Sequence, residues 1–374
     1  MTTAWTPAQV RTIDPATAPR VPVITGAERS DLLPGLVYWD MWPIQDAAGH
    51  IARLGERELW MALSAPHRGD PALRHFEAKI RLLERTGPLG AERWTDLGPV
   101  LPDCPVPYER EWAGSASTDG TRVSLWFTGA GTSERPGGYQ QALYEAHAII
   151  GPDGLPRDWS APQLSLASGP AYQSADAHDG EPGRIKAFRD PAWLCNPADG
   201  AEYLVFTASV AGASSPFNGA VGLARRTADG WEPLPPLVTA DGVNNELERA
   251  HVVVHQGRYL VFWVTQTSTF SPQLRSAPSG LYGMIADSLA GPWRPLNGSG
   301  LVLANPVDEP LQSYSWFVSA DLVVSSFVDI WGLRGGPCPV DTAALAHHFG
   351  GVPAPLLQLV VEGDCCRIAE RTTA

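Results

Sequence analysis

Short runs of aromatic and β-branched residues recur along the chain, and each one follows polar or glycine-containing turn signals. Such runs indicate buried β-strands. Aromatic markers in successive runs are 56 to 80 residues apart, a spacing that suits repeating units of four strands joined by long loops. The five runs cover residues 58–64, 122–128, 202–209, 258–266 and 322–331.

Helical patterns are few. Segments 5–13 and 342–348 favour short helices, and the rest of the chain is typical of β structure. No charged or low-complexity stretch marks a boundary between domains. The pattern therefore predicts an all-β fold, a five-bladed β-propeller with its active site in the central funnel, and a single domain over residues 1–374.

A cluster of polar and aromatic residues lies just upstream of each marker. In a propeller the first strand of every blade lines the central channel, so equivalent positions in successive blades converge although they are far apart in sequence. Three acids from different repeats can meet in this way. The clusters are Trp39-Asp40-Met41-Trp42, Trp112-Ala113-Gly114-Ser115, Arg189-Asp190-Pro191, Glu246-Leu247-Glu248-Arg249 and Tyr314-Ser315-Trp316.

The acids in these clusters suit glycoside cleavage, which needs one carboxylate as nucleophile or base and a second carboxyl group as proton donor. A nucleophile must stay ionised, which favours Asp40, whereas the acid must hold a proton near neutrality, which favours Glu248 beside the negative Glu246. Arg249 could moderate that repulsion. Asp190, fixed between Arg189 and a proline, would bind two sugar hydroxyls rather than react.

Each cluster has a commoner structural explanation when it is taken alone. Arg-Asp-Pro is a frequent loop tripeptide, Glu-Leu-Glu-Arg is more often a solvated turn, and Trp-Asp-Met-Trp is more often the edge of a core. Only the set of clusters favours a sugar site. The 14 tryptophans agree with that interpretation, because indole rings such as Trp39 and Trp112 pack well on the apolar faces of sugars.

Charge and composition exclude several other classes of function. A formal net charge of -13 argues against a nucleic-acid partner, since phosphate backbones need clustered Lys and Arg. No apolar run approaches a membrane span. Residues 1–14 lack the pattern of a signal peptide, so the sequence as written predicts a cytoplasmic protein, or an extracellular one if an export segment was removed. The five cysteines lack zinc-site spacing and no calcium-binding Asp/Asn cluster is evident, so we assign no metal and no cofactor.

The set of motifs resembles glycoside hydrolase family 68, which comprises levansucrases, inulosucrases and bacterial β-fructofuranosidases. The resemblance extends over most of the chain and keeps the family's order of motifs. Besides the clusters above, it rests on segments 5–8, 37–45, 111–116, 188–191, 248–251, 280–283, 291–300 and 313–316.

The resemblance implies a five-bladed propeller that cleaves sucrose through a covalent fructosyl-enzyme intermediate. Fructose would pass to water, a sugar or another small acceptor. The resemblance also assigns the nucleophile to Asp40, the transition-state stabiliser to Asp190 and the acid/base to Glu248. The residues that it places around the fructose and leaving-glucose subsites are Trp39, Trp112, Arg189, Glu246, Arg249 and Tyr314.

Three positions depart from the family pattern. The family usually carries a serine at position 113 that holds the nucleophile, and this chain has Ala113, so about 1.5–3 kcal/mol of positioning is lost unless water or Ser115 replaces the hydroxyl. Ala250 replaces a frequent proline, which is a mild change. Gln266 stands where polymer-forming relatives have Arg or His, and a neutral amide grips an acceptor sugar less strongly. We therefore expect hydrolysis and transfer to small acceptors over long polymer synthesis.

Two alternatives stay open on the sequence. A propeller glycosidase of another furanoside, such as arabinan, would share three acids on a similar scaffold. A non-catalytic sugar-binding propeller, inactivated at Ala113, is the other. An enzyme of another furanoside would release arabinose from arabinan, whereas a sucrose-cleaving enzyme would release glucose from sucrose. Saturable sucrose binding without product would identify a non-catalytic protein.

Overall fold

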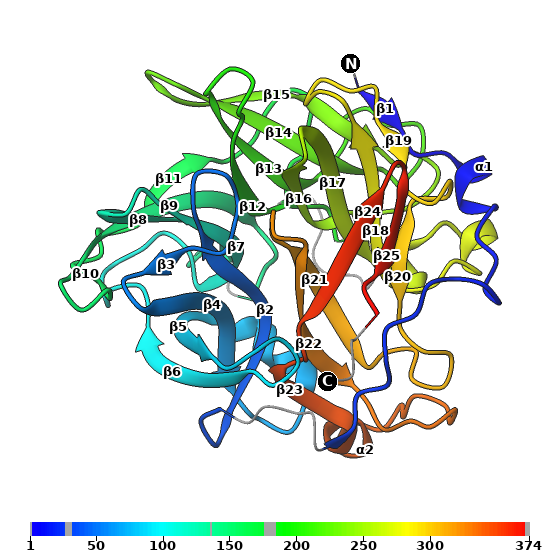
Figure 1. Cartoon of the computed structure of the whole chain (residues 1–374), viewed down its shortest axis with the longest axis horizontal. Coiled ribbons are helices and arrows are strands. Elements are labelled where there is room, and N and C mark those ends of the chain that lie inside the picture. The colour runs from blue at the N-terminus through cyan, green and yellow to red at the C-terminus, as the bar shows by residue number, and fades with distance from the viewer. Residues whose placement is uncertain (1, 27–31, 135–136, 176–184, 371–374) are drawn as a thin grey trace.

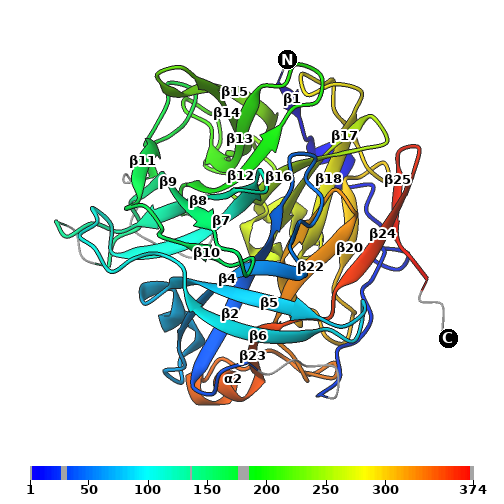
Figure 2. The same cartoon turned by 60° about the vertical axis from the view of Figure 1, so that its left-hand side comes forward.

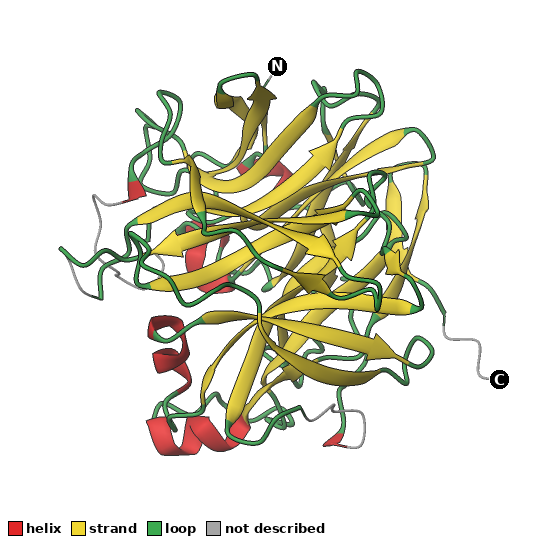
Figure 3. Cartoon of the chain, turned by 90° about the vertical axis from the view of Figure 1, so that its left-hand side faces the viewer, coloured by secondary structure: helices red, strands yellow, loops and turns green. Residues whose placement is uncertain are grey.

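The protein is nearly all β-structure in a computed structural model, which describes residues 2–26, 32–134, 137–175 and 185–370 (Figure 3). The described strands form four sheets arranged around the middle of the molecule (Figure 1). Within each sheet, strands that follow one another along the chain mostly pair in antiparallel fashion.

The largest sheet has ten strands and contains two antiparallel groups. The two groups meet in a short parallel pairing, where Ile44 and Gln45 of β2 lie opposite Ala116 and Ser117 of β7. One group comprises β2 (Leu36–Gln45), β3 (Arg53–Leu54), β4 (Arg57–Pro66), β5 (Lys79–Thr86) and β6 (Arg93–Pro99). The other comprises β7 (Arg110–Thr118), β8 (Arg122–Ala130), β9 (Gln141–Ile150), β10 (Pro156–Arg157) and β11 (Gln163–Leu166).

The other three sheets repeat the same antiparallel plan. One consists of β12 (Phe188–Cys195), β13 (Glu202–Ser209), β14 (Gly219–Thr227), β15 (Gly230–Thr239) and the N-terminal β1 (Thr3–Ala4), which pairs in parallel with β15. The next consists of β16 (Glu248–His255), β17 (Arg258–Thr265), β18 (Gly280–Ala286), β19 (Arg294–Pro295) and β20 (Leu301–Ala304). The last consists of β21 (Ser313–Val318), β22 (Val323–Ile330), β23 (Phe349–Pro353), β24 (Leu357–Glu362) and β25 (Cys365–Ile368).

The first strands of the five antiparallel groups form a closed cycle of contacts. β2 contacts β7, β7 contacts β12, β12 contacts β16, β16 contacts β21, and β21 contacts β2 again. Figures 1 and 2 both show these strands toward the middle of the molecule. Segments that are far apart in sequence are therefore neighbours at the centre.

The five predicted strand runs are confirmed, and each lies next to the first strand of its group in the sheet: β4, β8, β13, β17 and β22. These strands are apolar on both faces because each is buried between neighbouring sheets, so they show little alternation. That explains why they are the strongest signals in the sequence.

The two predicted helices are both present, and one is shorter than expected. Helix α2 spans Thr342–His348, as predicted, whereas α1 spans only Pro7–Val10. Thr6 and Gln9 form a capping box that starts α1 at Pro7. Trp5 lies before the helix because its side chain is anchored in the core, where its Nε1 donates to the carbonyl of Ser299.

Three short 3-10 helices complete the described elements: η2 (Pro71–Phe76), η4 (Thr267–Thr269) and η5 (Pro272–Leu274). None of the described helices is long and apolar enough to cross a membrane. Within the described ranges, no group of three or more His, Cys, Asp or Glu side chains is arranged to hold a metal ion.

Candidate active site

Each of the five first strands carries a β-bulge at an equivalent place. The pairing register shifts between Trp39 and Trp42 in β2 and between Trp112 and Gly114 in β7. The corresponding shifts in β12, β16 and β21 lie between Arg189 and Ala192, Glu248 and His251, and Tyr314 and Phe317. Because a bulge bends its strand and re-aims side chains, these positions turn toward the centre.

Four of the bulges hold a non-glycine residue in the left-handed region of the backbone map. The φ angles are 48° at Asp40, 57° at Asp190, 53° at Arg249 and 57° at Ser315. Ala113 occupies the equivalent place in β7. Such conformations cost about 1–3 kcal/mol each and persist only where the surrounding structure enforces them, which is common at functional sites. Three of these four residues, Asp40, Asp190 and Arg249, are also site residues predicted from the sequence.

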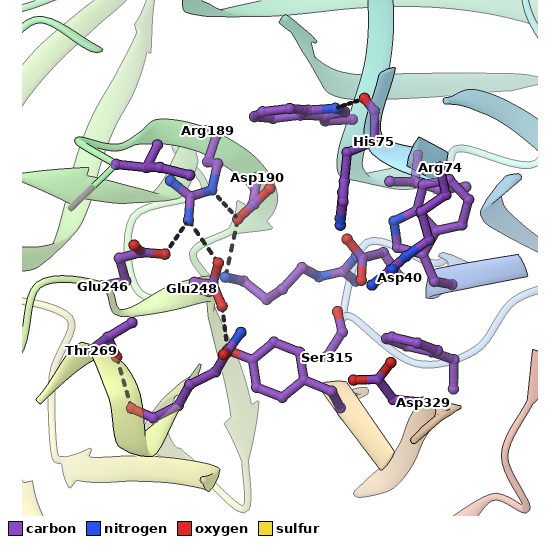
Figure 4. A pocket seen from close by; sticks show the side chains of 18 of the residues that line it. Asp40, Arg74, His75, Arg189, Asp190, Glu246, Glu248, Thr269, Ser315 and Asp329 are labelled. Carbon is purple, nitrogen blue, oxygen red and sulfur yellow. Dashed lines mark hydrogen bonds and ion pairs between the residues drawn. The ribbon is translucent and has the colours of Figure 1, made fainter. Parts of the chain in front are cut away.

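The bulges surround a cavity of about 310 Å³, which lies within the size range of small-molecule sites (Figure 4). All but one of the predicted site residues line it: Trp39, Asp40, Trp112, Arg189, Asp190, Glu246, Glu248, Arg249, Gln266 and Tyr314. The prediction that carboxylates from separate repeats gather in one cavity is confirmed.

Ser115 is the predicted site residue that lies outside the cavity lining. Its hydroxyl accepts a hydrogen bond from the backbone N–H of Trp193 at 2.8 Å, and the residue is fully buried. Ser115 follows the bulge at Ala113, so its side chain does not turn toward the centre of the molecule. It packs between β7 and β12 instead. Ser115 therefore does not replace the serine that this chain lacks at position 113.

Arg189 bridges two carboxyl groups on one wall of the cavity. Its Nη2 donates to Glu246 Oε2 at 2.8 Å and to Glu248 Oε1 at 2.7 Å (Figure 4). Tyr314 donates its hydroxyl to the other oxygen of Glu248. The sequence suggested Arg249 as the residue that moderates repulsion between the two glutamates, but these ion pairs belong to Arg189.

Asp190 is held rigidly beside this wall. Its Oδ2 accepts hydrogen bonds from Thr207 Oγ1 at 2.9 Å and from the backbone N–H of Arg249 at 3.3 Å. Its own N–H donates to Thr128 Oγ1 at 2.8 Å. Because the side chain is only 7% exposed, the free sites on its carboxylate face the cavity rather than solvent.

Known proteins with similar sequences are enzymes of the kind that this arrangement of carboxyl groups indicates. The family model described as Levansucrase/Invertase, that of glycoside hydrolase family 68, matches residues 1–221 and 213–372. The chain belongs to glycoside hydrolase family 68. A levansucrase of Rahnella aquatilis is 33% identical over 325 residues, which cover 78% of this chain and 72% of that protein.

A relative and a solved structure extend the match over nearly the whole chain. Levansucrase LscA of Pseudomonas savastanoi pv. glycinea is 28% identical over 399 residues, covering 94% of this chain and 89% of the relative. An inulosucrase from Halalkalicoccus jeotgali, solved with kestose bound, is 33% identical with a TM-score of 0.86 and covers 98% of this chain and 95% of that one. The resemblance noted in the sequence is thus confirmed.

Burial raises the pKa of Asp40 in this family 68 site to about 6. Arg249 and the Ser315 hydroxyl oppose that rise, while the charges of Asp190 and Glu248 add to it. The carboxyl group is therefore largely ionised at neutral pH, as a nucleophile requires.

Arg249 owes its position to the β16 bulge and to His251. The Nδ1 of His251 donates to the Arg249 carbonyl at 2.7 Å, and its Nε2 accepts from the Val318 N–H at 2.9 Å. Burial lowers the pKa of His251 to about 3, so the ring stays neutral and keeps this tautomer. The guanidinium lies 5.4 Å from the centroids of Trp42 and Phe317.

Several cavity residues were not predicted from the sequence. Leu63 and Phe327 lie on predicted strands but have no polar signal, and Ser315 lies inside one of the recognised clusters. Arg74 and His75 come from η2, which has no periodic pattern; Arg74 lies 5.6 Å from the Trp39 centroid, and the His75 carbonyl accepts from Trp112 Nε1 at 3.0 Å. The remaining unpredicted residues are Tyr139, Ile185, Ser268, Thr269 and Asp329.

Glu246 gives this site a pH-dependent effect on stability. Burial and the charge of the neighbouring Glu248 raise the pKa of Glu246 to about 8, although the charge of Arg189 opposes this rise. A glutamate in the unfolded chain titrates near 4.5. Between these two values the folded protein holds a proton that the unfolded chain has released, so stability falls as pH rises through this window. Glu246→Gln stays neutral and escapes that loss.

We therefore expect Glu246→Gln to melt higher than the wild type by roughly 2–4 °C at pH 8, with a smaller difference at pH 4.5. Thermal unfolding at both pH values measures this. The exposed Glu232 provides the control, because Glu232→Gln should show no such trend. A Glu246→Gln advantage that is equal at the two pH values would contradict the raised pKa.

Proposed function

We propose that this chain transfers β-fructosyl groups from sucrose, with retention of configuration, to water or to small acceptors. The observation that carries the proposal is the meeting of Asp40, Asp190 and Glu248, each from a different first strand, in one cavity of about 310 Å³. Membership of family 68, with levansucrase and inulosucrase relatives, supports fructosyl transfer and does not favour another furanoside or a non-catalytic binder.

The first half of the reaction forms a covalent intermediate. Glu248 donates its proton to the oxygen that joins glucose to fructose, and that bond to the anomeric carbon breaks. A carboxylate oxygen of Asp40 bonds to the same carbon from the opposite face, so glucose leaves and a fructosyl ester remains. Retention requires the two carboxyl groups to stand ~5–5.5 Å apart.

The second half reverses the proton transfer. Glu248, now ionised, removes a proton from water or an acceptor hydroxyl, whose oxygen attacks the anomeric carbon and releases Asp40. Asp190 accepts hydrogen bonds from fructosyl hydroxyls and steadies the ring as positive charge develops on it. Its fixed contacts to Thr207 and the Arg249 backbone suit this role, because they leave the carboxylate no freedom to turn away.

The remaining predicted residues divide between the two sugars. Trp39 and Trp112 offer aromatic surface to the fructosyl ring beside Asp40. Arg189, Glu246, Tyr314 and Gln266 lie around Glu248 on the wall that the leaving glucose, or an incoming acceptor, would contact. Arg249 offsets the negative charge between Asp40 and Asp190.

We further propose that the five antiparallel groups are the five blades of one propeller domain over residues 1–374. The ten-stranded sheet then counts as two blades joined by the parallel β2–β7 contact. The closed cycle of contacts among the five first strands supports this count, since it places one strand of each group around a common axis.

The proposal is tested by incubating the purified wild type with sucrose and, separately, with arabinan. Chromatography should show glucose and fructosyl products from sucrose and no arabinose from arabinan. Calorimetry in parallel measures binding. Saturable heat with sucrose and no released glucose would refute catalysis in favour of a sugar-binding protein.

Gln266 should determine how fructose is divided among products. Its neutral side chain lines the acceptor side of the cavity, where a cation would hold a growing chain through charge-assisted hydrogen bonds. We expect the wild type to give mainly free fructose and short oligosaccharides, and Gln266→Arg to increase the share of long polymer several-fold. Size-exclusion chromatography of the products measures this. Predominant high-molecular-weight polymer from the wild type would contradict the prediction.

A further inference from the structure

Asp40 stands between two equivalent positions in the cycle of first strands. β2 contacts β7 on one side and β21 on the other. The bulges of these neighbours hold Ala113 and Ser315. Ala113 has no polar side-chain atom, so of these two flanking side chains Ser315 is the one that can donate a hydrogen bond to the Asp40 carboxylate.

Ser315 has three properties that packing alone does not explain. Its φ of 57° is unfavourable for a residue other than glycine. Its side chain is 1% exposed, yet it lines the cavity. Among the described residues its Oγ has no hydrogen-bond partner of standard geometry, which is rare for a buried hydroxyl. Figure 4 shows it beside Asp40.

We propose that Ser315 is a positioning residue, whose hydroxyl donates a hydrogen bond to Asp40 and holds the nucleophile where Ala113 cannot. This inference rests on the proposed function, because it assigns Asp40 the attack on the fructosyl carbon. The hydroxyl lies near enough to the Asp40 carboxyl group to act on its pKa, and the bulge keeps the serine pointing inward rather than along the sheet.

The electrostatics of the site agree with this role. The charged groups that interact electrostatically with the Asp40 carboxylate are Arg249, Asp190, Glu248 and Arg74. Burial raises the pKa of Asp40, and the Ser315 hydroxyl opposes this rise because it stabilises the ionised carboxylate. The guanidinium of Arg249 donates through Nη2 to the Met41 carbonyl, so that nitrogen is already engaged.

The test compares Ser315→Ala and Ser315→Gly with the wild type across pH. Glycine adopts the left-handed backbone without strain, so it removes the hydroxyl and still permits the fold. Ser319→Ala is the matched control, because Ser319 is likewise a buried serine with no hydrogen-bond partner for its Oγ in the described structure but lies outside the cavity lining.

Both Ser315 variants should lose about 10-fold or more in kcat/KM for sucrose. The acid limb of their pH profile should move up by about one unit, because a nucleophile that lacks this donor ionises at higher pH. Adding Ala113→Ser to Ser315→Ala should restore part of the rate and return the limb toward its original position, since the new hydroxyl flanks Asp40 from β7.

Wild-type rates and an unchanged acid limb in both Ser315 variants would overturn the inference. Ser319→Ala should retain the wild-type rate and profile, and an equal loss there would also overturn it, since any buried serine would then give the effect. The wild type is assayed first. If it releases no glucose from sucrose, the proposed function itself fails; if it turns over normally, the Ser315 variants test the positioning role alone.

Discussion

Replacing Asp40 by asparagine is expected to reduce sucrose cleavage by at least ~10³-fold while sucrose binding stays measurable. The amide has nearly the shape of the carboxylate but is a far weaker nucleophile, so no fructosyl ester forms. Asparagine tolerates positive φ better than most residues and suits the 48° angle at this bulge. The variant also removes a buried charge, so its melting temperature should not fall.

Glucose release and calorimetry with sucrose measure the two halves of this prediction. Asp229→Asn, at an exposed position in the turn between β14 and β15, is the matched control and should behave as the wild type. An Asp40→Asn protein that folds, binds sucrose and still turns over near the wild-type rate would show that another residue is the nucleophile.

The wild-type pH profile gives an independent check on Asp40. Since the pKa of its carboxyl group is raised to about 6, kcat/KM for sucrose should decline as pH falls through that value. The decline follows from loss of the ionised form rather than from unfolding. Circular dichroism across the same range separates the two causes.

In each group the sequence predicted the strand next to the first strand, because those strands are buried on both faces. Residues 202–209 were predicted and found at the same bounds, since the apolar run of β13 begins and ends at polar turns. The first strands were located only through their polar clusters. Their bulges interrupt the two-residue alternation, so no periodic pattern identifies them.

The same bulges explain the misplacement of Ser115 and the omission of Ser315 from the predicted site. In a regular strand, residues 113 and 115 would share a face, which made Ser115 a reasonable substitute for a missing hydroxyl at position 113. The bulge at Ala113 breaks that relation. The hydroxyl near Asp40 comes instead from Ser315 of β21, about 275 residues beyond Asp40 in the sequence. Such proximity follows from closure of the strand cycle.

Arg74 and His75 are cavity residues that the sequence could not predict, for a different reason. They approach the cavity from η2, a short 3-10 helix that Asp70 caps by accepting a hydrogen bond from the Ala72 N–H. Turn residues of this kind show where a loop bends, not which distant side chains it will meet. The segment is held at the site by the packing of Arg74 over Trp39, Phe327 and Phe349 and by the hydrogen bond from Trp112 Nε1 to the His75 carbonyl.

The choice between Glu246 and Glu248 as proton donor can be settled by experiment. Both contact Arg189 Nη2, and Glu246 has the raised pKa. Glu248, however, lies at the bulge of a first strand, in the position equivalent to Trp39 and Arg189, whereas Glu246 precedes the strand and its backbone is held by Asn244 Oδ1. The charge of Glu248 also raises the pKa of Asp40, which shows that Glu248 lies near that carboxyl group, so its position favours Glu248 as the acid.

Glu248→Gln should reduce the rate with sucrose by about 10²–10⁴-fold. β-Fructosyl fluoride needs no protonation of its leaving group, so the variant should still form the ester on Asp40 from this donor. The ester then accumulates, because no base remains to activate water, and mass spectrometry of the intact protein should detect one added fructosyl group. Azide, which needs no base, should release it as fructosyl azide. Glu246→Gln should show neither the accumulation nor the azide effect; if it alone shows both, Glu246 is the acid/base residue.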